Sequence, residues 1–195
     1  MNGDPAPVSA HLSSSAGCRA ARLLGWPGVE LPVMTLFGCR VSPVVVLDRA
    51  AHRARRASGD GPQLDGDTLA VWEWPESTGQ APASVVALSG LLVPARGSRA
   101  WCAALQRARS LRGFGPTAAL TAPDVEPGEV CRLEHALHGI GLVTTNPDAS
   151  GPVVWAEPGR CARARRRTAD RWLEELLYRA ALDSGALCGI GDTLW

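Results

Sequence analysis

The sequence of 195 residues contains no lysine, and all 20 of its basic residues are arginines. A lysine is required for a Schiff base with a carbonyl substrate or with pyridoxal phosphate, for a Ser-Lys dyad, and for the P-loop that binds nucleotide phosphates. These classes of mechanism are therefore excluded. Isoleucine is also scarce, occurring only at positions 140 and 190, a bias that GC-rich coding produces.

Membrane-spanning and secretory patterns are missing as well. No uninterrupted run of apolar residues reaches the length of a membrane-spanning helix, and the N-terminus lacks the basic region and apolar stretch of a signal peptide. The six cysteines are scattered without a C-x-x-C pair. Their even number leaves a disulfide set open, but the spacing favours free, mostly buried thiols in a reducing compartment. We therefore expect a cytoplasmic protein.

The hydrophobic pattern predicts alternating helices and strands. Helices are expected over 16–24, 99–112, 128–138 and about 160–183, and strands over 67–74, 84–92, 117–121, 140–145 and 152–156, with an extended segment over 29–37. This order predicts a single α/β domain over 16–184, with a mixed central sheet of about five to six strands flanked by helices in two or three layers. Residues 1–15 are expected to form a flexible segment and 185–195 a tail.

Local sequence signals leave two interpretations of residues 43–57 open and predict which face of the helix over 128–138 turns inward. Ser42 followed by Pro43 is typical of a helix N-terminus and predicts a helix over 43–57, but the β-branched valines leave a strand over 44–47 and a shorter helix as the alternative. In the helix at 128–138, the spacing predicts an inward stripe formed by Val130, Leu133 and Leu137.

This layout resembles the PD-(D/E)XK nuclease fold over about 42–156, including the phrase His138-Gly139-Ile140-Gly141-Leu142 after a helix. The resemblance implies an aspartate at the start of one strand, which Asp67 matches, and an acidic-x-Lys motif on the next. Ala87 and Ser89 stand at those two positions instead. Metal-dependent hydrolysis needs clustered carboxylates, so the resemblance implies a degenerate, inactive copy.

Other catalytic or cofactor-binding patterns are also missing. Cys131, His135 and His138 share one face of the predicted helix, but structural zinc sites use paired Cys/His spacings, so we expect no metal there. Neither G-x-S-x-G, G-x-G-x-x-G nor H-E-x-x-H occurs. We expect no catalytic residues and no cofactor. A hydrolase assembled from distant Asp, Glu and His residues remains an alternative.

Arginine clusters are the main positive signal. The densest set is predicted to bind nucleic acid, because one guanidinium group can donate hydrogen bonds to two phosphate oxygens. It comprises Arg160, Arg163, Arg165, Arg166, Arg167 and Arg171. Arg49, Arg53, Arg55 and Arg56 form a second set, and a third lies around 96–112. The alternative is a solvated charged face in a protein whose net charge is only +1.

Seven tryptophans suggest a second kind of binding surface. Trp72 and Trp74 would share one face of the predicted strand over 67–74, and Trp195 ends the apolar tail. The sequence thus predicts a non-catalytic binding or accessory protein that holds nucleic acid through arginines. The alternative is an adaptor or assembly subunit that binds a protein partner, or another copy of the chain, through Trp72, Trp74 and Trp195.

Overall fold

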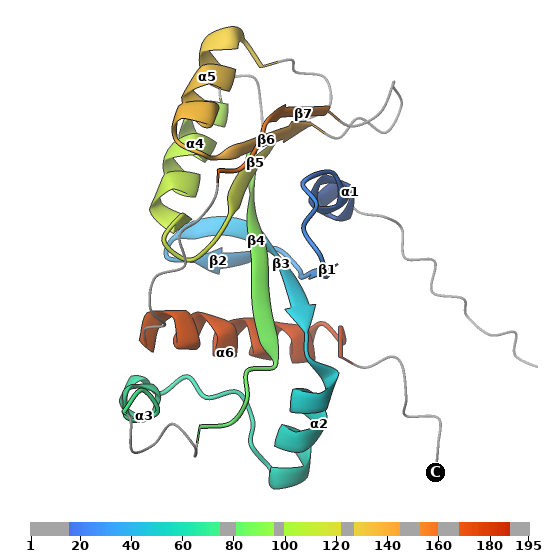
Figure 1. Cartoon of the computed structure of the whole chain (residues 1–195), viewed down its shortest axis with the longest axis vertical. Helices are drawn as coiled ribbons and strands as arrows, with labels where there is room; N and C mark the ends of the chain where they lie inside the picture. Colours follow the sequence, from blue (N-terminus) through green and yellow to red (C-terminus); the bar gives the residue numbers. More distant parts are fainter. Residues whose placement is uncertain are drawn as a thin grey trace, which may run out of the picture.

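The structure, a computed structural model, describes residues 16–74, 81–95, 100–121, 127–144, 153–159 and 168–187 (Figure 1). Its helices are α1 (Ala16–Leu23), α2 (Arg49–Ser58), α3 (Gly66–Val71), α4 (Ala100–Leu111), α5 (Glu129–Leu137) and α6 (Thr168–Asp183). Its strands are β1 (Val29–Glu30), β2 (Met34–Leu36), β3 (Cys39–Leu47), β4 (Val86–Ala95), β5 (Thr117–Thr121), β6 (Gly141–Thr144) and β7 (Val153–Ala156). None of the helices within these ranges has the length and apolar character needed to span a membrane.

The strands form one mixed sheet, which confirms the predicted α/β class. Its order is β1-β3-β4-β5-β6-β7, and β2 pairs with β3 as a hairpin. β4, β5 and β6 run parallel, whereas β3 and β7 run antiparallel to their neighbours. Parallel neighbours need crossover connections, and α4 and α5 supply the two that join β4, β5 and β6.

Alternating side chains of the central strands build two hydrophobic clusters, one on each face of the sheet. On β4, Leu91 and Val93 enter the larger cluster with residues of α4 and α6, whereas Leu92 enters the smaller cluster beneath α1. Figure 1 shows α1 on one side of the sheet and α4 and α5 on the other. The sheet is therefore the middle layer of three in this part of the molecule.

The smaller cluster is closed by an aromatic ring that rests on a glycine. A Cβ atom at Gly90 of β4 would lie 2.4 Å from ring atoms of Trp26. Trp26 is buried together with Ala20 and Leu24 at the end of α1. The contact brings the α1 layer against the central strand, and only glycine leaves room for it.

The predicted helix over 43–57 is wrong, and the alternative is confirmed. Pro43 lies within β3 opposite Leu91, and its carbonyl accepts a hydrogen bond from the Leu31 N–H at 2.8 Å. Val44 and Val45 flank a register shift and enter opposite clusters. Burial of the valine run on both faces of a sheet outweighs the Ser-Pro signal. The helix that follows begins only at Arg49.

The predicted strand over 67–74 is also wrong, because residues Gly66–Val71 form α3. Asp65 caps this helix by accepting hydrogen bonds from the Thr68 N–H at 2.9 Å and the Thr68 hydroxyl at 2.6 Å. These bonds hold the pKa of the exposed Asp65 below its ordinary value. An N-cap of this kind favours a helical turn over a strand. Trp72 and Trp74 consequently do not share a strand face.

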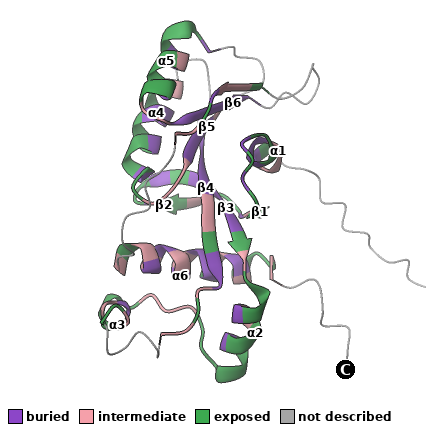
Figure 2. Ribbon diagram, viewed as in Figure 1, coloured by how far each residue is buried: buried purple, intermediate pink, exposed green. Residues whose placement is uncertain are grey.

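The inward stripe predicted for α5 is a third correction. Val130, Leu133 and Leu137 are exposed, whereas Cys131 and His135 are buried. Figure 2 shows the outer side of α5 as exposed. The helix therefore turns its apolar stripe to solvent and its Cys/His face to the sheet.

Candidate nucleic-acid interface

The densest arginine set predicted to bind nucleic acid lies mostly outside the described residues, since only Arg171 falls within them. The second set, on α2, is described in full. It divides into one buried member, Arg55, and three exposed members, Arg49, Arg53 and Arg56. Sequence reasoning grouped all four, but it could not separate the buried guanidinium from the exposed ones.

The exposed arginines of α2 line one face of the helix. They are spaced by four and three residues, so they extend over about 10 Å of helix axis. The helix contains no acidic residue. In the described part of the chain, none of the three takes part in an ion pair. They form a short row of accessible guanidinium groups, named here the α2 arginine row.

The two carboxylates that flank α2 in the sequence are engaged in local hydrogen bonds. Asp48 is the N-cap and accepts from the Ala51 N–H at 2.9 Å, and Asp60 accepts from the Ser58 hydroxyl at 2.6 Å. Gly59 ends the helix in the left-handed conformation, with φ of 78°. The ends of α2 are thus defined by its own caps, and these acids are held at the termini rather than along the arginine row.

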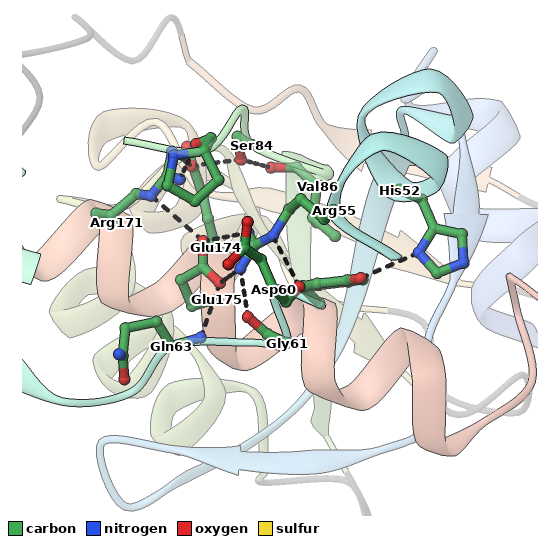
Figure 3. Close-up of polar contacts among 12 residues, drawn as sticks. His52, Arg55, Asp60, Gly61, Gln63, Ser84, Val86, Arg171, Glu174 and Glu175 are labelled. Atoms are coloured by element: carbon green, nitrogen blue, oxygen red, sulfur yellow. Dashed lines mark hydrogen bonds and ion pairs between the residues drawn. The ribbon is translucent and has the colours of Figure 1, made fainter. Parts of the chain in front are cut away.

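A buried two-point ion pair fixes which face of α2 turns outward. The Arg55 Nη1 and Nη2 atoms lie 2.8 and 2.9 Å from Oε1 and Oε2 of Glu175 on α6, and Figure 3 shows the two side chains facing each other. Their side chains are 2% and 1% exposed. Arg55 also donates to the Gly61 carbonyl, and its guanidinium lies over the Tyr178 ring. Anchoring Arg55 inward leaves the α2 arginine row facing solvent.

Arg171 belongs to the same buried network, and this corrects its assignment to a nucleic-acid surface. Its side chain is 8% exposed, and its Nε lies 3.3 Å from Oε1 of Glu175. It donates to the Pro82 carbonyl and stacks over the Trp72 ring. The spacing that suggested a basic run could not reveal that Glu175, four residues later, draws this arginine inward.

A hollow of about 390 Å³ adjoins the network. Its lining includes Arg55, Asp60, Gln63, Trp72 and Pro82. Arg55 is already bound by Glu175, and the Gln63 N–H donates to the same carboxylate at 3.0 Å. The Arg55 guanidinium and the Gln63 N–H in the hollow are thus occupied by protein groups, whereas the α2 arginine row is accessible.

The two tryptophans predicted to bind a partner have different environments. Trp72 is partly buried beneath Arg171, whereas Trp74 is 60% exposed. They come from the end of α3 and the turn after it. Trp195 lies outside the described residues. Of the two that the structure describes, Trp74 is the exposed one.

The Cys/His face of α5 packs inward. Burial raises the pKa of Cys131 to about 11 and lowers the pKa of His135. Backbone groups of Gly141 and Ile140 act on the pKa of His135 in the opposite sense to burial. Across those residues, no group of three or more Cys, His, Asp or Glu side chains is arranged to hold a metal ion.

The positions that the nuclease resemblance singled out are spread over different elements. Asp67 lies in the first turn of α3, and not at the start of a strand as the resemblance implied. Ala87 is exposed and Ser89 partly buried on β4.

Comparisons with protein-family models, with curated proteins and with solved structures found no match.

Proposed function

We propose that this protein is a non-catalytic nucleic-acid-binding or accessory protein, and that α2 contacts the phosphate backbone through Arg49, Arg53 and Arg56. The observation that carries the proposal is the α2 arginine row: three exposed guanidinium groups on one helix face that has no acidic residue. Planar guanidinium groups bind phosphate oxygens through two parallel hydrogen bonds, which makes such a row suited to a polyanion.

The buried anchor of α2 supports the proposal further. Because Arg55 and Glu175 hold the helix against α6, the exposed arginines project from a rigid element. An anchored helix loses less backbone freedom on binding than a flexible arm does. Contacts to phosphates position a protein on nucleic acid without reading its sequence. We therefore expect binding that depends strongly on salt and weakly on base sequence.

The order of elements supports a nuclease-like origin as part of the proposal. The unit β4-α4-β5-α5-β6 provides parallel strands with helical crossovers behind an antiparallel β3. Ala87 and Ser89 on β4 stand where the resemblance implies an acid and a lysine. This part of the proposal is an analogy of fold alone, and the exposed arginines of α2 carry the proposed binding.

The test replaces Arg49, Arg53 and Arg56 together by glutamine in the full chain. Fluorescence anisotropy with labelled single-stranded and duplex oligonucleotides is measured over a range of salt concentrations. For three lost phosphate contacts on duplex DNA, the slope of log K against log salt becomes shallower by about 2 to 3. Weaker binding in low salt accompanies that change.

A matched control removes the same charge elsewhere. Arg40, Arg107 and Arg109 are also exposed, and their replacement by glutamine lowers the net charge equally. Equal losses in the two triple variants, or no loss in either, contradict the assignment to α2. The same assay on a variant with Arg163, Arg165, Arg166 and Arg167 changed to glutamine tests the densest arginine set.

A further inference from the structure

Helix α5 displays an apolar seam that no described part of the chain covers. Val130, Leu133 and Leu137 are 71%, 62% and 81% exposed. Their spacing of three and four residues matches that of the a and d positions along which helices pair. These three residues are named here the α5 seam. A contiguous row of large apolar side chains in water marks an interaction site more often than isolated exposed residues do.

Contacts on the opposite side of α5 fix its rotation. His135, which lies opposite the seam on the helix, is fully buried, and Cys131 is buried beside it. Arg132 donates to the Pro127 carbonyl at 2.8 Å, and its guanidinium lies 4.0 Å from the centroid of a Trp155 ring. Turning the seam inward would break these contacts. The seam is therefore a stable outward feature of the helix.

Acidic side chains flank the seam on both sides. With 100° of rotation per residue, Glu129 lies to one side of the seam and Glu134 to the other. Both are exposed, and neither takes part in an ion pair within the described ranges. A helix that packs on the seam would bring its own flanking residues against these carboxylates, and arginine or lysine at those positions would complement them.

We propose that the α5 seam binds an amphipathic helix of another protein, one whose apolar stripe is flanked by basic residues. Association would remove Val130, Leu133 and Leu137 from water, and this burial supplies the driving force. Glu129 and Glu134 select the partner by charge. The inference is independent of nucleic-acid binding, because α2 and α5 lie at opposite ends of the molecule (Figure 1).

Charge also argues against a second copy of this chain as the occupant. In a parallel pair of α5 helices, Glu129 of one copy would face Glu134 of the other. In an antiparallel pair, like positions face each other, so that Glu134 would oppose Glu134. Both arrangements bring carboxylates together, whereas a basic helix neutralises them.

The test uses two synthetic helical peptides of about three heptads. Both carry leucine at the seam positions. The flanking positions are arginine in one and glutamate in the other. Titration calorimetry with the full chain measures binding of each. We expect the basic peptide to bind and the acidic peptide to bind about tenfold more weakly or not at all.

Two variants localise the contact. Leu133→Asp combined with Leu137→Asp should weaken binding of the basic peptide by about tenfold or more, because the bound peptide would bury each of these leucine side chains. Glu129→Gln combined with Glu134→Gln should reduce the preference for the basic peptide while leaving the fold intact. All four positions are exposed, and circular dichroism checks that the variants fold.

Three results would overturn the proposal. The first is failure of the basic peptide to bind, and the second is equal binding of both peptides. The third is self-association of the chain, measured by sedimentation, that is lost in the variant with Leu133→Asp and Leu137→Asp. The variant with Arg49, Arg53 and Arg56 changed to glutamine serves as a control, because it should bind the basic peptide as the unaltered chain does. Failure of nucleic-acid binding therefore leaves this test unaffected.

Discussion

Arg55 and Glu175 are separated by 120 positions in the chain and form a two-point ion pair with distances of 2.8 and 2.9 Å. The pair joins α2 to α6 at nearly complete burial. Arg171 approaches the same carboxylate from α6 itself. One carboxylate thus contacts two guanidinium groups in the interior, and its loss removes the ion-pair partner of Arg55, whereas Arg171 keeps Glu174, whose Oε2 lies 3.9 Å from its Nη1.

Glu175→Gln should therefore destabilise the protein strongly. Removing one partner of a buried ion pair typically costs about 3 to 5 kcal/mol, and here the buried Arg55 loses its carboxylate. Denaturant unfolding followed by circular dichroism measures the change. Glu134→Gln, at an exposed position of α5, is the matched control and should have little effect.

A double variant separates two contributions to the free energy of unfolding: the attraction between Arg55 and Glu175, and the cost of leaving one of these charges buried without its partner. Arg55→Met with Glu175→Leu should be less destabilised than the sum of the two single changes, because no unpaired member of this pair remains. Additive losses would show that the two side chains stabilise the fold independently.

His135 should make stability depend on pH. Burial lowers the pKa of His135, so the unfolded chain binds a proton at a pH at which the folded chain does not. Above the ordinary histidine pKa both states are neutral and the effect is absent. As the pH falls from there toward the lowered pKa, the free energy of unfolding should decrease by up to about 1.4 kcal/mol per pH unit.

Unfolding measured between pH 7.5 and pH 5.5 tests this expectation. His135→Leu should flatten the dependence, whereas His138→Gln, at the end of the same helix, should retain it. If the His135→Leu variant follows the same pH profile as the unaltered chain, another group is responsible.

Two cysteines of the α4–α5 region should react with thiol reagents at very different rates. Burial raises the pKa of Cys131 to about 11, so about one thiol in a thousand is ionised at pH 8. Cys102 is exposed on α4. Alkylation by iodoacetamide, followed by peptide mass spectrometry, should label Cys102 well before Cys131.

Unfolding in guanidinium chloride is the control for this experiment. It should bring the two labelling rates together, because it removes the burial that protects Cys131. Comparable labelling of both cysteines in the folded protein would contradict the inward orientation of α5.

Gly90→Ala should destabilise the layer formed by α1. The added methyl group would lie 2.4 Å from the Trp26 ring, which forces a shift of either the ring or the strand. Overpacking of this kind costs about 1 to 3 kcal/mol. Thermal unfolding and Trp fluorescence measure the change. Gly113→Ala, where a Cβ atom would meet nothing within 4 Å, should leave the packing unchanged.

Much of the sheet was predictable because the hydrophobic pattern within each strand and crossover helix indicates its secondary structure. The strand predicted over 117–121 matches β5, and the helix predicted over 99–112 corresponds to α4, which buries Ala104, Leu105, Ala108 and Leu111 in the larger cluster. Pro43 shows the limit of such signals. Its preference for a helix start was overridden by pairing with β4, which is a contact with distant residues.

The sequence by itself determined the α/β class, the alternation of elements, the absence of lysine chemistry and the presence of arginine clusters. Only the tertiary structure decided which arginines are accessible, because the inward turn of Arg55 and Arg171 depends on Glu175. It also decided the orientation of α5, since periodicity defines an apolar stripe without stating whether the sheet or a partner covers it. Both outcomes depend on contacts between segments far apart in the chain, which local spacing does not encode.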